Sequence, residues 1–590
     1  MSNETNRSAE AMAIRELSKD RLKYDFERGY TKRETNYERG KYEVNGEVYF
    51  PWMFSKTLVH DEDTGFAKKD HILKVVKAQE KADKESLKDL ENLVPSDKRA
   101  PLTGITADNS YNLMGMDSFL PTSNKFYTIT SKKGLFEMAE VYVKSLVRDI
   151  AFCDFNEKNR NVEKYERWLN EFGEINITAP MELDISKNKK HINFKTFLRG
   201  NGKDELTGPY ISQFLYLPFA YGNNVVHQKY FSEPDNVSSV TSQGWRQIQN
   251  GEISTEGAKS LLNQDQKSFK YCHTPRVLGS MVHRDPLYQF YYNAALVALQ
   301  NDIKLQGFDN IINKDNFRST EWTSSGNPDV FASIAHVALG ALRVAWYHKY
   351  GVAMKIRPEV YAQRIQLAYE KDDQFVKNVE GLRTLKVKCD ENYMQELLQE
   401  VSEKNNELLG KVNNNNRNYY LNLQYPEGSP THPSHPAGHA CVAGACCTVL
   451  KAMFQCHKKN FDQKLPWPRD AMHSIDGDEL VNFGKNHKMT IVGEFNKLAS
   501  NISLGRDFAG VHYRADGDYG MAIGEQYAIS YLTDKCKEYY ESKDKSGLFK
   551  GFFLEKFDGT KVVIKRSGEE PYSPPSLASN ILNFFNSSSN

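Results

Sequence analysis

The sequence predicts a mostly α-helical protein, and three of its segments carry that prediction. Apolar residues recur at three-to-four spacing in GLFEMAEVYVKSLVRDIAF (134–152) and in PLYQFYYNAALVALQNDI (286–303), as on the buried face of a helix. The third segment, 330–350, is mostly apolar and follows Asn327-Pro328-Asp329, which combines a capping residue, a first-turn proline and an acidic residue. We therefore expect an all-α fold in which residues 330–350 form a central helix.

The first part of the chain differs in composition from the rest. Residues 1–100 are polar, and the charged segment from Lys68 onward predicts an amphipathic helix with a solvated outer face. We expect residues 1–100 to form a polar arm or extension and residues 101–590 to form one large helical domain. Near the C-terminus, the alternating segment KVVIKR (561–566) follows Asp558-Gly559 and predicts a minor β-hairpin.

Composition and charge argue against several classes of function. The 590 residues include 77 basic and 76 acidic ones, so no bulk attraction to nucleic acid or to an anionic membrane is expected. The N-terminus is polar and no uninterrupted window of about 18 apolar residues occurs, so we expect a cytoplasmic protein without a membrane span. The eight cysteines include no CxxC pair, which argues against a disulfide framework or a zinc site. Cys441, Cys446 and Cys447 are expected to be small core side chains.

Three segments could bind an anion, and the first is KYGVAMKIRP (349–358), at the end of the predicted central helix. Arg357 precedes a proline and is therefore expected to leave the helix in an extended conformation. Lys349 lies near a helix C-terminus, where complementing the helix dipole is an alternative explanation of its charge.

The second segment is THPSHPAGHACVAGACCTVL (431–450), where three histidines precede a run of small apolar residues. These histidines are His432, His435 and His439. Pro433 and Pro436 delay the helix, so Ala437-Gly438-His439 is expected to form its first turn. First-turn amides have no partner inside the helix, and glycine lets a ligand approach the backbone, so an anion can bind here. A histidine satisfied within the core is the alternative for any one of the three.

The third segment is SLGRDFAGVHYRADGDYG (503–520). Arg506 offers a planar fork of donors to a tetrahedral oxyanion. His512 and Asp516 are four residues apart, so on a helix they share a face and the carboxylate could orient the imidazole. An ordinary salt-bridged helix is the alternative. The DGD triplets at 476–478 and 516–518 are expected to mark turns, because the rest of an EF-hand loop is missing.

Together the three segments would place Lys349, Arg357 and Arg506 beside two histidines and free helix-start amides. A protein of balanced charge would not bury that much positive potential without an anion to neutralise it. We therefore expect a binding site for a phosphate-like tetrahedral oxyanion.

The same three segments resemble the vanadium-dependent haloperoxidases, in particular the algal and bacterial bromoperoxidase type. That family shares its anion pocket with the type 2 phosphatidic-acid phosphatase superfamily. Its pattern is a lysine leading to Arg-Pro, a Pro-Ser-Gly-His turn, and an arginine followed six residues later by histidine; this chain has KYGVAMKIRP, HPAGHA and GRDFAGVHYRAD. Other segments resemble the algal type in the same order, among them VYVKSLVRDIAF, GPYISQFLYLPF and QYPEGSPTHPSHPAGHA. The resemblance implies two four-helix bundles with the oxyanion site between helices, and a homodimer or larger homo-oligomer.

The resemblance also implies a cofactor and a role for each residue. His512 would bind the vanadium of vanadate, in the +5 state, through one imidazole nitrogen. The vanadate oxygens would be held by four groups, the side chains of Lys349, Arg357 and Arg506 and the amide of Gly438. His439 would be the general acid–base toward hydrogen peroxide, Lys349 would polarise the bound peroxide, and His432 would tune peroxide and halide reactivity. The implied reaction is oxidation of bromide or iodide by hydrogen peroxide to hypohalous acid, which halogenates a small organic acceptor.

One residue departs from the family pattern, because Ala437 stands where the family has a serine whose hydroxyl donates to vanadate. A hydrogen bond to a charged group contributes about 1.5–3 kcal/mol. Its loss corresponds to roughly ten- to hundred-fold weaker vanadate binding, unless water or His435 substitutes. The departure leaves halide preference open and could suit the pocket to another oxyanion.

Two alternative functions use the same residues. A soluble acid phosphatase of the type 2 phosphatidic-acid phosphatase superfamily would use His512 as nucleophile and His439 to protonate the leaving group. A non-catalytic oxyanion-binding protein would have lost its activity with the serine. Phosphate-ester turnover without vanadate identifies the first alternative, and an Ala437→Ser variant that gains no activity identifies the second.

Overall fold

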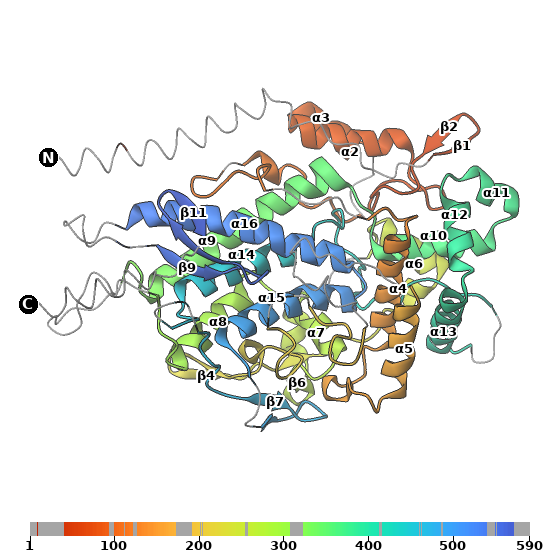
Figure 1. Cartoon of the computed structure of the whole chain (residues 1–590). Helices are drawn as coiled ribbons and strands as arrows, with labels where there is room; N and C mark the ends of the chain where they lie inside the picture. The colour runs from red at the N-terminus through yellow and green to blue at the C-terminus, as the bar shows by residue number, and fades with distance from the viewer. Residues whose placement is uncertain are drawn as a thin grey trace, which may run out of the picture.

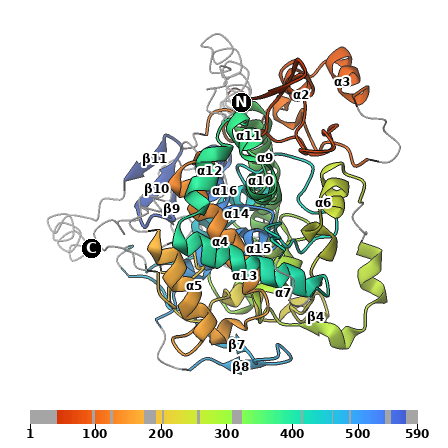
Figure 2. The ribbon, with the colours of Figure 1, turned by 90° about the vertical axis from the view of Figure 1, so that its right-hand side faces the viewer.

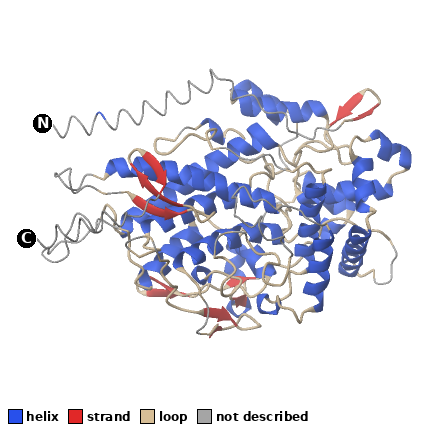
Figure 3. Cartoon of the chain, viewed as in Figure 1, coloured by secondary structure: helices blue, strands red, loops and turns tan. Residues whose placement is uncertain are grey.

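The computed structural model describes Ala9 and residues 41–93, 99–110, 112–121, 127–172, 192–200, 202, 204–253, 258–306, 323–411, 416–458, 461, 463–484, 488–539, 549 and 551–571. Within these residues helices dominate, and the strands form five small sheets (Figure 3). The predicted all-α class with minor β-hairpins is confirmed.

Four long helices form the centre of the protein (Figure 1): α9 (Asn327–Trp346), α14 (Gly438–Met453), α15 (Ile491–Phe508) and α16 (Arg514–Glu538). Helix α14 packs against each of the other three. A Cβ added at Gly444 of α14 would lie 2.1 Å from the carbonyl oxygen of Met521 in α16. Because no side chain fits in that space, glycine allows the two helices to approach this closely. The predicted central helix is confirmed as α9, with Pro328 in its first turn.

A second group of helices packs beside the first and faces the viewer in Figure 2: α4 (Lys132–Leu146), α5 (Arg160–Glu171), α10 (Pro358–Glu370), α12 (Leu382–Cys389) and α13 (Asn392–Leu408). Helix α13 contacts α4, α5 and α12, and α10 contacts α4 and α12. Helix α4 also packs against α15, so it joins the two groups. The implied arrangement of two helical bundles is therefore confirmed.

Three of the predicted helices differ in extent from the structure. The segment predicted at 134–152 forms α4, which ends at Leu146. The charged segment from Lys68 forms two helices, α2 (Lys69–Lys81) and α3 (Lys84–Glu91). They are separate because Ala82 ends α2 in the left-handed region (φ 48°), and the Asp83 carboxylate then accepts from the Ser86 amide at 2.8 Å as the cap of α3. The segment predicted at 286–303 forms α8 (Gln289–Gln300).

Shorter elements connect these helices. The remaining α-helices are α6 (Ser242–Gln249), α7 (Pro275–Met281) and α11 (Asp373–Asn378). The 3₁₀ turns are Ala107–Asn109, Phe152–Asp154, Gln213–Leu215, Val237–Val240, Ala258–Asn263 and Gln266–Ser268. A π-helical turn, Tyr347–Ala353, continues α9 and carries Lys349.

The strands form antiparallel pairs at the periphery. The two-stranded sheets pair β1 (Tyr42–Val44) with β2 (Glu47–Tyr49), β3 (Phe219–Tyr221) with β4 (Asn224–Val226), β5 (Tyr230–Phe231) with β6 (Phe269–Lys270), and β7 (Ala471–His473) with β8 (Leu480–Asn482). The predicted C-terminal hairpin is part of a three-stranded sheet of β9 (Phe552–Glu555), β10 (Lys561–Lys565) and β11 (Gly568–Pro571). The DGD triplet at 476–478 lies between β7 and β8 as predicted, whereas the triplet at 516–518 lies within α16, so the turn predicted there is wrong.

The helical run Asn327–Ala353 is long and apolar enough, by length and composition, to cross a membrane. Half of its most apolar window is buried inside the protein, where α9 packs against α8, α14 and α16. Lys349 has no exposed surface in this run. A core helix between other helices needs the same apolar composition, so packing accounts for it.

Candidate functional site

The three segments predicted to bind an anion meet where the ends of five helical segments come together. Lys349 lies in the π-helical turn after α9, and Arg357 lies directly before α10. Gly438 and His439 open α14. Arg506 lies in the last turn of α15, and His512 lies just before α16. Residues separated by as many as 163 positions (349 to 512) are thus brought to one place.

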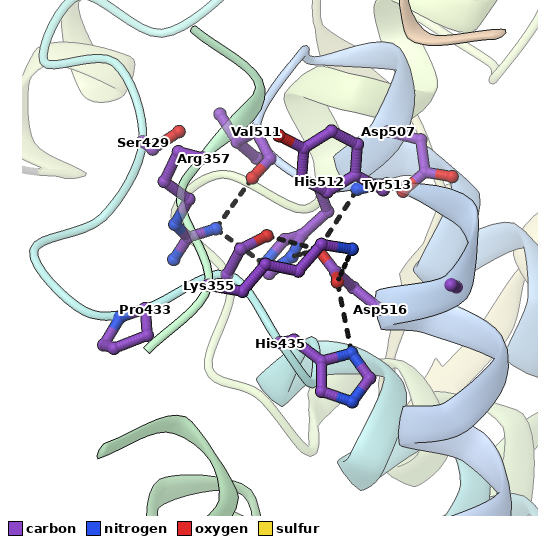
Figure 4. A network of polar contacts seen from close by, with 12 residues as sticks. Lys355, Arg357, Ser429, Pro433, His435, Asp507, Val511, His512, Tyr513 and Asp516 are labelled. Carbon is purple, nitrogen blue, oxygen red and sulfur yellow. Dashed lines mark hydrogen bonds and ion pairs between the residues drawn. The ribbon is translucent and has the colours of Figure 1, made fainter. Parts of the chain in front are cut away.

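Arg357 links all three segments through its guanidinium group. Its φ of −81° and ψ of 157° are extended, as the following proline predicts. Its Nη1 donates to the carbonyl oxygen of Val511 at 2.7 Å and to Nε2 of His512 at 2.9 Å (Figure 4). Its Nε donates to the carbonyl oxygen of His432 at 3.0 Å. Burial lowers the pKa of Arg357 to about 10, and Arg506 nearby acts in the same direction.

The neighbours of His512 determine its tautomer. Arginine can only donate, so Nε2 of His512 must accept from Arg357 and carry the lone pair. The Nδ1–H then donates to Oδ2 of Asp516 at 3.1 Å. Burial, with the positive charge of Arg357 next, holds the pKa of His512 well below its ordinary value. His512 is therefore neutral, and the Nε2 lone pair, which accepts from Arg357 here, would bind a metal only if Arg357 turned this N–H toward the oxyanion.

Asp516 receives hydrogen bonds from all three segments (Figure 4). Lys355 donates to Oδ1 at 3.2 Å, Nδ1 of His435 lies 3.3 Å from Oδ1, and the Ser434 hydroxyl donates to Oδ2. Burial alone would raise the pKa of Asp516, but Lys355 and the two histidines hold it well below its ordinary value. The contact with His512 is the one predicted, but its geometry differs, because His512 lies before α16 and Asp516 in its first turn.

Lys349 is fully buried and faces the histidine segment. Its Nζ donates to the carbonyl oxygens of Pro433 at 2.7 Å and of Ser434 at 3.1 Å. Burial, followed by repulsion from Arg357, lowers the pKa of Lys349 well below its ordinary value. The lysine is thus positioned by backbone groups and would be stabilised in its charged form by an anion.

His439 contacts a residue that the sequence analysis missed. Its Nε2 lies 3.0 Å from Oδ1 of Asp285, which follows α7 and is buried. Burial lowers the pKa of His439, although Asp285 opposes that shift. The signal in the sequence is the charged cluster His283-Arg284-Asp285, but nothing local places it beside α14.

Arg506 has hydrogen-bonding capacity left over. Its Nη1 donates to the carbonyl oxygen of Val282 at 2.5 Å and to the Tyr425 hydroxyl at 3.3 Å. Its Nε is buried and has no hydrogen-bond partner among the residues that the structure describes. A buried guanidinium N–H without an acceptor is costly unless a ligand accepts from it.

His432 and Trp346 lie next to the start of α14. Nη2 of Arg357 donates to Nδ1 of His432 at 2.9 Å, and the ring centroids of His432 and Trp346 are 4.7 Å apart. A Cβ at Gly438 would lie 3.2 Å from Cζ3 of Trp346, so glycine lets the indole pack closely against the helix start. Sequence analysis did not identify Trp346 as a site residue, because it lies in a mostly apolar helix whose residues were expected to form the core.

The first turn of α14 has the predicted form without the family hydroxyl. Ala437 is the N-cap residue, and its side chain makes no capping hydrogen bond. The nearest serine in the chain, Ser434, donates to Asp516. His435, which we considered as a substitute, also directs Nδ1 toward Asp516. The first-turn amides of α14 are therefore not capped by the Ala437 side chain.

The donor set fits an oxyanion such as vanadate. Three cationic side chains and a helix N-terminus supply positive charge, Nε of Arg506 supplies an unused donor, and Nε2 of His512 supplies a lone pair. No group of three or more His, Cys, Asp or Glu residues able to hold a metal cation occurs in the described part of the chain. The site thus has the chemistry of a pocket for a metal oxyanion rather than for a bare cation.

Comparison with known proteins points the same way. Residues 400–541, which include His439, Arg506 and His512, match the model of the VCPO second helical-bundle domain. The chain is 29% identical over 580 residues to the vanadium-dependent bromoperoxidase of Corallina officinalis, covering 88% of this chain and 92% of that protein. It is 28% identical over 531 residues to that of Ascophyllum nodosum, covering 88% and 89%. The solved homohexameric second vanadate-dependent bromoperoxidase of Ascophyllum nodosum superposes with a TM-score of 0.74 at 23% identity, covering 88% of this chain and 84% of that one. The resemblance to the vanadium-dependent haloperoxidases is thus confirmed: the chain is related to them in sequence along most of its length and has their helical fold.

Proposed function

We propose that this protein is a vanadium-dependent haloperoxidase that oxidises bromide or iodide with hydrogen peroxide, giving hypohalous acid that halogenates a small organic acceptor. The observation that carries the proposal is the neutral, buried His512, whose Nε2 lone pair faces Arg357 and lies near the charge of Lys349. An imidazole lone pair inside a cationic pocket suits a metal that is itself part of an anion.

The residues that would hold vanadate can be assigned roles from their chemistry. Vanadate(V) bound at Nε2 of His512 would supply Lewis-acid activation of peroxide without changing its own oxidation state. Its oxygens would be held by four groups, the side chains of Lys349, Arg357 and Arg506 and the Gly438 amide. Asp516 keeps the proton on Nδ1 of His512, so the ligating nitrogen stays unprotonated.

His439 is the residue suited to move a proton. Asp285 accepts from Nε2–H of His439, which leaves the lone pair on Nδ1. Because burial lowers the pKa of His439, the ring is neutral near pH 7 and can take a proton from hydrogen peroxide. The resulting imidazolium would be stabilised by Asp285 and could return the proton to the product.

Halide would approach past His432 and Trp346. His432 is held by Arg357, and its ring lies against the half-buried indole of Trp346. Burial, with Lys349 and Arg357 next, lowers the pKa of His432 well below its ordinary value, so it presents a neutral ring to an incoming anion. His432 is therefore suited to tune peroxide and halide reactivity rather than to bind charge.

Bromination of a dye with peroxide and bromide, before and after incubation with orthovanadate, tests the proposal. Activity that appears only after orthovanadate supports both cofactor and reaction. Absence of bromination across pH 5 to 8, together with turnover of a phosphate monoester in the absence of vanadate, would instead support the phosphatase alternative. In that case the lone pair of His512 would attack phosphorus.

We also propose that the protein assembles into a homo-oligomer. The homohexameric relative with the same fold supports this proposal. Light scattering coupled to size exclusion tests it, since a single species of 67.6 kDa would contradict assembly.

A further inference from the structure

We propose that His283 is a positioning residue that holds the turn 282–285, and through it sets Arg506 and His439 against the bound anion. The inference deepens the proposed function and rests on it, because Arg506 and His439 are the residues that would hold and protonate the reacting groups.

The turn 282–285 contacts the site at both of its ends. It follows α7, and the carbonyl oxygen of Val282 accepts from Nη1 of Arg506 at 2.5 Å. At the other end, Oδ1 of Asp285 lies 3.0 Å from Nε2 of His439. A shift of this turn would therefore move a guanidinium donor and the partner of the acid–base histidine together.

His283 anchors the turn between two carboxylates. Its Nδ1 lies 2.7 Å from Oε2 of Glu233, and its Nε2 lies 2.7 Å from Oε1 of Glu427. The ring is buried, with a side-chain exposure of 3%. Both ring nitrogens can donate only in the protonated form, so the geometry corresponds to an imidazolium held by two charge-assisted hydrogen bonds.

Glu427 belongs to the loop that leads into the helix start at Gly438. Glu233 follows β5. His283 therefore ties the turn after α7 both to the strand region and to the segment that carries His432 and His439. Neutral hydrogen bonds join the same parts: Gln424 donates to the Glu233 carbonyl oxygen and to Ser280, and Asn236 donates to the carbonyl oxygens of Tyr425 and Pro426. His283 adds the charge-assisted contacts to this set.

A tyrosine extends the anchor toward Arg506. The rings of His283 and Tyr425 are stacked, with centroids 3.8 Å apart and planes inclined by 4°. The guanidinium carbon of Arg506 lies 5.0 Å from the centre of the same Tyr425 ring, and Nη1 donates to its hydroxyl at 3.3 Å. The Tyr425 hydroxyl in turn donates to the carbonyl oxygen of Gly279 in α7. Arg506 is thus oriented by Val282 and Tyr425, and His283 holds both.

The orientation of Arg506 and of Asp285, the partner of His439, depends on these contacts because each of the two residues keeps an unpaired polar atom. Nε of Arg506 and Oδ2 of Asp285 are buried without a hydrogen-bond partner among the described residues. Their directions therefore depend on the contacts made by the turn and by Tyr425, rather than on a saturated network. Loss of the anchor is expected to misplace them without disturbing Arg357 or Asp516 on the other side of the pocket.

The anchor depends on pH through the charge of His283. Burial would lower the pKa of His283, but the hydrogen bonds and charges of Glu233 and Glu427 raise it above its ordinary value. Another charged group on these carboxylates is Arg284, whose Nη2 lies 3.1 Å from Oε1 of Glu233. Arg276 and Lys56 lie nearby and donate to the backbone carbonyl oxygens of Glu233 and Glu427. The contribution of the protonated anchor is fully present below about pH 6.5 and is lost as pH rises through the folded pKa of His283.

The test compares His283→Gln with a matched control, His457→Gln. His457 is also a buried histidine paired with a carboxylate, Nε2 to Oε2 of Glu555 at 2.9 Å, but it lies on none of the site segments. Retention of orthovanadate is measured by equilibrium dialysis at pH 6 and pH 9, alongside thermal unfolding and the separate kcat and KM values for peroxide. Orthovanadate changes its own protonation over this range equally for every variant, so ratios to the wild type are compared.

We expect His283→Gln to weaken orthovanadate retention about tenfold at pH 6, with a smaller ratio at pH 9, and to lower kcat. His457→Gln should reduce thermal stability and leave retention within about twofold. Glu427→Gln, which keeps an acceptor for His283 but removes one charge, should shift the loss of retention to lower pH. This variant keeps the inference testable if His283→Gln does not fold.

Three results would overturn the inference: wild-type retention in His283→Gln at both pH values, an equal loss in His457→Gln, or a wild-type protein that retains neither orthovanadate nor inorganic phosphate. A wild-type protein that retains orthovanadate but oxidises no halide would contradict the proposed function alone. The dialysis comparison would then still decide the role of His283.

Discussion

The two sides of the proposed anion site differ in how their polar atoms are paired. On one side, Arg357 donates to Val511, His432 and His512, and Asp516 accepts from side chains of all three segments. On the other side, Nε of Arg506 and Oδ2 of Asp285 are buried without partners among the described residues. On the first side, the Arg357 donors and the Nε2 lone pair of His512 already have protein partners that a bound vanadate would have to replace. The second side keeps unused hydrogen-bonding capacity for a bound ion and a moving proton.

The largest effect is expected for His512→Ala. This change removes the lone pair that the paired side presents to the pocket, so vanadium retention should fall by about a hundredfold or more. Vanadium content after dialysis measures it, with His457→Ala as the control for loss of a buried imidazole. Undiminished retention in His512→Ala would place the metal elsewhere.

Substitutions of Arg357 and Arg506 should differ in their effect on the free energy of unfolding but be similar in their effect on orthovanadate binding. Arg357→Ala leaves the carbonyl oxygens of His432 and Val511 without their donor, so we expect the free energy of unfolding to fall by about 3 kcal/mol. Arg506→Ala removes a charge that repels Arg357 and breaks fewer bonds, so the loss of stability should be smaller. Both variants should weaken orthovanadate binding roughly ten- to hundred-fold.

Chemical denaturation and equilibrium dialysis on the two variants measure these effects. Equal destabilisation by the two substitutions would contradict the difference between the two sides of the pocket. Unchanged binding in Arg506→Ala would show that its unpaired Nε does not face the anion.

The smallest effect is expected for Ala437→Ser. The new hydroxyl lies at the N-cap of α14, where the native side chain makes no hydrogen bond, and can donate to a vanadate oxygen. Orthovanadate binding should tighten about tenfold, corresponding to about 1.4 kcal/mol. Unchanged binding together with no gain in bromination would favour the non-catalytic oxyanion-binding alternative.

Local rules predicted the parts of the site that depend on neighbouring residues. The proline after Arg357 predicted its extended conformation. Pro433 and Pro436 predicted that the first helical turn comprises Ala437-Gly438-His439, and α14 begins at Gly438 with Ala437 as its N-cap. These features follow from steric restriction of one or two residues, and the structure bears them out.

Contacts between distant segments could not be predicted in this way. Asp285 is 154 positions before His439, and Lys355 is 161 positions before Asp516. Lys355 lies in the loop before α10, whereas its partner Asp516 lies in the first turn of α16, so no local pattern identifies the pair. Likewise, the sequence shows Trp346 only as one apolar residue of a helix, and its contact with Gly438 follows from tertiary packing.

The central claim is that His512 binds the metal while His439 moves the proton, and one experiment tests it most directly. Vanadium content and vanadate-dependent bromination are measured together on the wild type, His439→Ala and His512→Ala. We expect His439→Ala to retain vanadium and to brominate about 10²–10⁴-fold more slowly, whereas His512→Ala loses both. Equal loss of vanadium in the two variants would contradict the account.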